Sequence, residues 1–151
     1  MYSDPRIIRF VTDHFLPVRV HVREQKDQFQ QLGDRYGAHW TPTILVLDPS
    51  GQERHRIEGF LPSKDFLGQL GLGRGHSAFN RGEFAEAALQ FHEVLDKHAE
   101  SDVAPEAMYW HGVARYKETG EAHVLGETHR KLAERYPESS WVKKASVWGS
   151  G

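Results

Sequence analysis

The hydrophobic residues of the 151-residue chain follow two different patterns, and the change between them lies near the middle. Up to about residue 72, stretches with helical spacing alternate with short stretches that have the period of two or the continuous apolar run of a β-strand. Beyond residue 72, only helical spacing recurs. The pattern therefore predicts an α/β domain followed by an all-α region.

The composition places the chain among globular proteins. Hydrophobic residues make up 38% of it and charged residues 26%, which separates it from disordered chains. No apolar run approaches the roughly 18–20 residues that a bilayer span needs, so we expect no membrane insertion. The opening residues, MYSDPRIIRF, lack the character of a signal peptide. We therefore expect a cytoplasmic protein, unless a longer chain carries a signal peptide before Met1.

Three helices are predicted in the first half. The first begins at Ser3-Asp4-Pro5, where a capping oxygen precedes a proline in the first turn, and its apolar residues recur at steps of four. The second covers Lys26 to Tyr36 and is ended by Gly37. The third begins at Ser63 and continues to about residue 70.

Three strands are predicted between these helices. In residues 16–22, leucine and valine alternate with proline and polar residues, which is the pattern of a strand with one buried face. Residues 43–47 form a continuous apolar run, typical of a strand covered on both faces. The turn sequence at 48–51, Asp-Pro-Ser-Gly, then leads into a more polar strand over residues 52–60, as expected near a sheet edge.

The residues around this turn resemble the C-terminal part of the thioredoxin fold. The most specific element is Trp40-Thr41-Pro42-Thr43 followed by ILVLD, and the downstream stretch from Gly51 through RIEGF to the helix at 63–70 also matches. The resemblance covers about residues 2–70 and implies a cis-proline at Pro42. In that fold the backbone of the residue before the proline pairs with an extended substrate peptide. The resemblance therefore implies peptide binding by Trp40, Thr41 and Pro42.

Two interpretations stay open for this motif. Pro42 is either one wall of a peptide groove or a conformational lock that turns the chain into the following strand. Trp40 is either an exposed platform beside the loop or a cover of the core.

The chain departs from this family because it has no cysteine. A thiolate is the nucleophile of thiol–disulfide exchange, so no catalytic residue is assigned. In the family, a Cys-x-x-Cys motif and the strand before it would lie immediately upstream of Tyr2, and that strand would lie between strands 16–22 and 43–48. Three explanations follow: an N-terminally truncated domain, a partner strand that makes a dimer through the exposed sheet edge, or direct pairing of 16–22 with 43–48.

The second half begins with a glycine-rich stretch, GLGRG at residues 71–75. It follows a helix rather than a strand, which favours a linker over a nucleotide-binding loop. Residues 76–151 resemble two tetratricopeptide repeats and a closing helix, with turns at Gly82 and Gly120. Aromatic residues at helical spacing are expected to fill the repeat core, and Tyr109 and Tyr116 to line a groove for a partner peptide.

Charged and histidine residues point to no further ligand. No two of the ten histidines are four residues apart, and no HExxH motif occurs, so we expect neither a metal nor another cofactor. The formal net charge of −2 offers no general attraction to a phosphate backbone, so we expect no nucleic-acid partner.

Two functions are compatible with these observations. The first is a protein of thiol–disulfide oxidoreductase lineage with a role in redox homeostasis. It is redox-inactive as written, and becomes catalytic only if an upstream segment supplies a Cys-x-x-Cys motif whose thiolate attacks a substrate disulfide. The second is a non-enzymatic adaptor in which the repeats bind a protein or peptide and the thioredoxin-like half is a platform.

Overall fold

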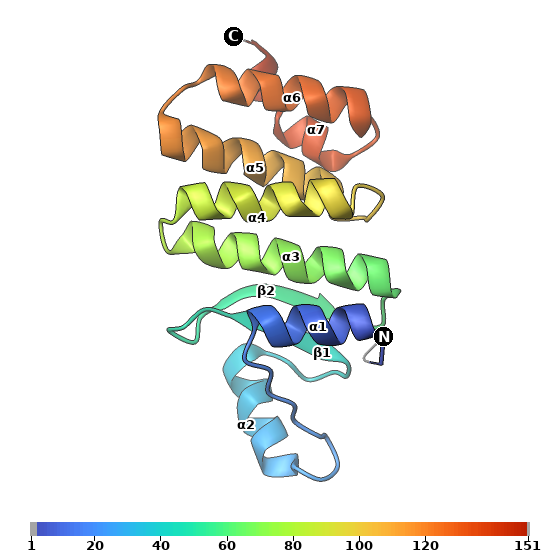
Figure 1. Ribbon diagram of the computed structural model, residues 1–151. Helices are drawn as coiled ribbons and strands as arrows, with labels where there is room; N and C mark the ends of the chain where they lie inside the picture. The colour runs from blue at the N-terminus through green and yellow to red at the C-terminus, as the bar shows by residue number, and fades with distance from the viewer. Residues whose placement is uncertain (1–2, 151) are drawn as a thin grey trace.

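The computed structural model describes residues 3–150, so Met1, Tyr2 and Gly151 of the predicted domains lie outside the described residues. The molecule is a stack that begins with a small α/β layer and continues as a column of helices (Figure 1). In chain order its elements are α1 (Pro5–His14), α2 (Lys26–Tyr36), β1 (Thr43–Leu47), β2 (Glu53–Glu58), α3 (Ser63–Asn80), α4 (Phe84–Lys97), α5 (Ala104–Thr119), α6 (His123–Arg135), α7 (Ser140–Lys144) and the 3-10 helix η1 (Ser146–Ser150).

The sheet of the described region is a hairpin of two antiparallel strands, β1 and β2. Val46 lies opposite His55, and the register shifts immediately after Val46. The N–H of Gly51 closes the turn by donating to the carbonyl of Asp48 at 2.9 Å. The two predicted strands and the turn between them are therefore confirmed, although the second strand is shorter than expected.

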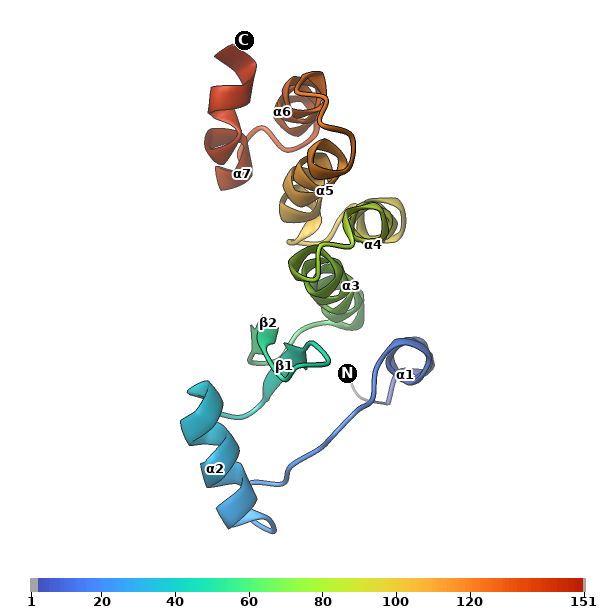
Figure 2. The same ribbon diagram turned by 90° about the vertical axis from the view of Figure 1, so that its left-hand side faces the viewer.

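Helix α3 joins the two halves of the molecule. One side of it packs on both strands and another side packs on α4 (Figure 2). The core on the sheet side is built around Ile7, Val46, Ile57, Phe66, Leu67 and Leu70. The core on the other side is larger and includes Leu72, Phe91, Val94, Ala107, Met108 and Leu132.

The glycine-rich stretch 71–75 lies inside α3 and is not the predicted linker. A Cβ on Gly73 would lie 2.9 Å from Val46 Cγ2, and a Cβ on Gly75 would lie 2.4 Å from Phe91 Cε1. The glycines therefore allow the helix backbone to approach the sheet on one side and α4 on the other. The glycines of residues 71–75 therefore do not act as a flexible linker. The halves predicted as 1–70 and 76–151 share one continuous helix, α3.

Residues 16–22 do not form the predicted strand. They connect α1 to α2 without regular secondary structure and run apart from both strands (Figure 2). Leu16 is 93% exposed and Val18 is 78% exposed. Strand β1 buries Val46, but residues 43–45 are only half-buried and Leu47 is exposed, so the predicted cover on both faces is not found. The alternation of residue types was not sufficient, because a strand also has to lie next to another strand, and residues 16–22 lie apart from the open edge of β1.

The helical region consists of two helical hairpins, α3–α4 and α5–α6, closed by α7 and η1 (Figure 1). Gly82 and Gly120 occupy the turns with φ values of 78° and 72°, a left-handed conformation that suits glycine. The predicted turns and the predicted region of packed helices are confirmed. Its identity as tetratricopeptide repeats stays a prediction.

Candidate functional site

The free edge of β1 is the feature of the α/β layer that can accept a partner. The N–H of Gly59 donates to the carbonyl of Pro42, and the N–H of Asp48 donates to the carbonyl of Gln52, each at 2.9 Å. Backbone groups alternate between the two sides of a strand, so the N–H and C=O groups of residues 43, 45 and 47 point away from β2. No strand among the described residues pairs with them.

Two exposed aromatic side chains flank Pro42, where β1 begins: Trp40 precedes it in the chain, and Phe60 follows β2 on the paired side of β1. Trp40 is 73% exposed, so it does not cover the core. It precedes the Thr41–Pro42 peptide bond, which is cis as the resemblance implies. Phe60 is 71% exposed and follows Gly59, the residue bonded to Pro42. The structure therefore exposes Trp40 beside the cis-proline, and it also exposes Phe60 at the end of β2, which the sequence reasoning did not single out.

Arg56 on β2 fixes the segment that leads into this edge. Its guanidinium donates to the carbonyl oxygens of Tyr36 and Gly37 at the end of α2, the latter at 3.2 Å. It also pairs with Glu53 at 2.7 Å, and the hydrogen bond that it donates to that carboxylate raises the pKa of Arg56. The hydroxyl of Tyr36 donates to the carbonyl of Gly51 at 2.9 Å. These polar bonds tie the end of α2 to the hairpin.

Asp4 holds the beginning of α1 near the beginning of α3. Its carboxylate accepts the N–H of Arg6 at 2.9 Å and pairs with the guanidinium at 2.7 Å. Hydrogen bonds from Arg6, with a further one from Ser63, hold the pKa of Asp4 well below its usual range. The carboxylate therefore stays ionised at neutral pH, which suits a structural anchor and not a proton donor.

A histidine cluster lies at the joint between the sheet and the helices. His55 Nε2 and Gln69 Oε1 are 2.5 Å apart, the rings of His55 and His76 stack with centroids 6.2 Å apart, and His76 Nε2 is 3.5 Å from Glu106 Oε1. Burial lowers the pKa of His55, which favours its neutral form. Within residues 3–150, no group of three such side chains is arranged to hold a metal ion.

The two tyrosines predicted to bind a partner lie on α5, on the other side of α3 from the sheet (Figure 1). The ring of Tyr109 stacks on Trp148 with centroids 4.6 Å apart and lies 5.0 Å from the ring of Trp141. Tyr116 is half-buried near the C-terminal end of the helix. The structure thus places these tyrosines apart from the edge of β1, and their partner-binding role stays a prediction.

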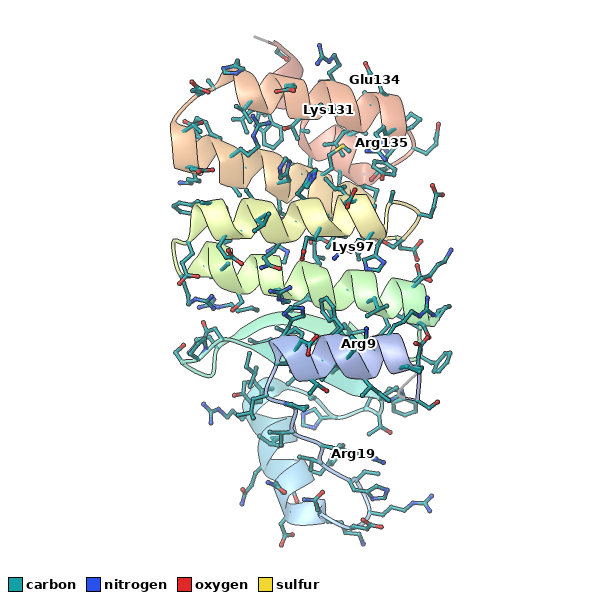
Figure 3. The ribbon with its side chains drawn as sticks, viewed as in Figure 1. Arg9, Arg19, Lys97, Lys131, Glu134 and Arg135 are labelled. Atoms are coloured by element: carbon teal, nitrogen blue, oxygen red, sulfur yellow. The ribbon has the colours of Figure 1, made fainter. Side chains whose placement is uncertain are left out.

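The outer surface of α1, α4 and α6 carries charges of both signs (Figure 3). Lys97 Nζ lies 3.6 Å from Glu93, and Lys131 Nζ lies 3.0 Å from Glu127. Pairs of this kind on an exposed surface contribute little to stability. None of the described helices is both long enough and apolar enough to cross a membrane.

Comparison with known families gives one match. Residues 1–73 match the family described as the thioredoxin-like domain. No match was found among curated proteins or among solved structures. A thioredoxin-like domain without any cysteine therefore occupies residues 1–73, and a region of packed helices follows it.

Proposed function

We propose that this protein is a non-catalytic interaction module of thiol–disulfide oxidoreductase lineage, in which the free edge of β1 binds an extended segment of a partner protein. The observation that carries the proposal is the row of unpaired backbone groups on β1, at residues 43, 45 and 47, which follows directly on the exposed Trp40 and the cis-proline loop. An extended peptide at such an edge gains main-chain hydrogen bonds, and neighbouring side chains select its residues.

The chemistry of the chain favours binding over catalysis. Thiol–disulfide exchange needs a thiolate, and no residue of this chain can form one. Pairing with the backbone of a peptide needs only the N–H and C=O groups of an accessible strand. The loop and the strand inherited from the lineage therefore keep a use that does not depend on sulfur.

The helical region supports this edge by holding the hairpin in place. A two-stranded hairpin alone is at best marginally stable in water. Here Val46 of β1 and Ile57 of β2 are buried beside Phe66 and Leu70 of α3. A strand held in this way is already in the conformation that a peptide requires, which lowers the entropy cost of binding.

The proposal is tested with a fluorescent peptide of alternating valine and threonine, with two lysines at each end for solubility. We expect binding in a fluorescence polarisation titration. The matched control is the same peptide with every second amide N-methylated, which removes the N–H donors of one edge and should abolish binding. Equal binding of both peptides, or binding of neither, would overturn the proposal.

Two variants locate the binding surface. Trp40→Ala removes the exposed ring beside the edge and should weaken peptide binding about tenfold, as truncation of an aromatic contact residue commonly does. Leu89→Ala is the control, because Leu89 is also exposed (56%) but lies on α4. An equal loss in both variants would show that the peptide binds elsewhere.

A further inference from the structure

We infer that residues 16–22 of a second copy of this chain occupy the free edge of β1, so that two copies exchange these segments and form a dimer. The inference rests on the proposed function only in that it uses the same strand edge. It names a partner that the chain itself provides.

The first observation is that residues 16–20 have an unpaired backbone, although His21 at the end of the segment is already hydrogen-bonded to Gln25. Leu16 is 93% exposed and Val18 is 78% exposed, although both are apolar. The segment runs apart from the sheet, and Figure 3 shows Arg19 on this connection. Within residues 3–150, the backbone groups of residues 16–20 make no hydrogen bond to the rest of the chain. Alternating apolar residues with an unpaired backbone are what a pairing strand requires.

The second observation is the unprotected state of β1. Proteins commonly guard an exposed edge with charged residues, proline or a bulge. Between residues 43 and 46, β1 has no charged residue, no proline and no bulge, and its irregularity begins only at the Val46/Leu47 step. No charge on β1 opposes the approach of Arg19.

The two elements also match in length. Strand β1 has five residues, and the five unpaired residues 16–20 span about 17 Å when extended, which is enough to cover it. Pro17 does not interrupt the pairing. Backbone N–H groups alternate between the two edges of a strand, so the missing N–H of Pro17 belongs to the edge of the odd-numbered residues. The edge formed by residues 16, 18, 20 and 22 is complete.

A second copy is the occupant that these features favour, because each copy carries both an unpaired segment and an unpaired edge. Exchange in both directions uses the same two surfaces twice and gives a closed dimer with two-fold symmetry. The contact is small compared with the roughly 800 Å² per partner of a standard interface, so we expect a dissociation constant in the micromolar range.

Sedimentation over a concentration series from micromolar to millimolar tests the inference. We expect the wild-type chain to form a dimer, and Val18→Lys to raise the dissociation constant by at least about a hundredfold, because its ammonium group would enter an apolar contact. Val147→Lys is the matched control, since Val147 is also an exposed valine (73%) but lies in η1. A monomer at every concentration overturns the inference, and so does an equal response of the two variants.

A spin label shows which surfaces meet. The chain has no cysteine, so Arg19→Cys takes a single nitroxide label without background. After mixing with unlabelled, ¹⁵N-enriched chain, the amide signals of residues 43–47 should broaden. Broadening confined to other elements overturns the inference. If only the inference of exchange is wrong, the chain is a monomer that still binds the valine–threonine peptide. If the proposed function is wrong, the monomeric Val18→Lys variant does not bind that peptide.

Discussion

The helical region and the α/β layer differ in how they use their apolar residues. The largest fully buried side chains all lie in the helical region, and they are Phe91, Leu72, Leu132, Val94 and Val124. The most exposed apolar side chains of the α/β layer are Leu16, Val18, Trp40 and Phe60. The helical region also exposes single apolar residues, Leu89 and Val147, but only the α/β layer combines exposed apolar residues with an open strand edge. An open strand edge and exposed apolar residues in the same layer are typical of an interaction surface.

Replacing one phenylalanine in each region gives the sharpest test of this difference. Phe91→Ala leaves a cavity at the contact of α3, α4 and α5 and should lower the free energy of unfolding by about 3–5 kcal/mol. Phe60→Ala removes a ring that is already 71% exposed, so its effect should stay within about 0.5 kcal/mol. Urea denaturation followed by circular dichroism measures both, and similar losses would contradict the comparison.

Protonation of His111 at low pH should lower the stability of the helical region. Burial on α5, with a contribution from His92, lowers the pKa of His111 from 6.5 to about 4. Above pH 6.5 the residue is neutral in both states. Below 6.5 the unfolded chain binds the proton more readily, so stability falls as the pH drops from 6.5 to 4, by up to about 3 kcal/mol.

The control for this pH dependence is His111→Gln. Burial also lowers the pKa of His55, so the informative quantity is the difference between wild type and variant. That difference should grow between pH 6.5 and 4 and stay constant elsewhere. Parallel stability curves would refute the assignment to His111.

Alanine substitutions at two helical glycines distinguish the effect of close packing on stability from the effect of helix propensity. Gly75→Ala places a methyl group 2.4 Å from the buried ring of Phe91 and should destabilise the protein by about 1–3 kcal/mol. Gly126→Ala, on α6, has only the Trp148 carbonyl at 3.5 Å and should stabilise it by about 0.5–1 kcal/mol. Thermal unfolding measures both changes, and an unchanged or raised stability of Gly75→Ala would show that α3 tolerates a side chain at residue 75.

Hydrogen exchange compares the two regions without a mutation and has the smallest expected effect. In the monomeric Val18→Lys variant, the amides of residues 16–20 should exchange with almost no protection, because they make no hydrogen bond within the chain. The central amides of α4 and α5 should exchange only on global unfolding. Protection of residues 16–20 in that variant would mean that they pair with their own β1.

The sequence was a good guide to elements with a local signal. Asp4 and Pro5 marked the beginning of α1, Gly37 marked the end of α2, and the motif around Pro42 indicated the thioredoxin-like domain. It was a poor guide where the signal depends on a distant neighbour. The alternation in residues 16–22 suggested a strand that has no partner, and the glycines at 71–75 suggested a linker where two layers meet closely.

The amino-acid sequence by itself determined that this chain has no thiolate chemistry, that its first half is thioredoxin-like and that its second half is helical. Local propensities, caps and residue types are sufficient for these conclusions. Only the tertiary structure decided that α3 continues through Gly71, Gly73 and Gly75, that Trp40 and Phe60 are exposed, and that β1 has an open edge. Burial and strand pairing arise from contacts between residues far apart in the chain, and the pattern of one segment does not contain them.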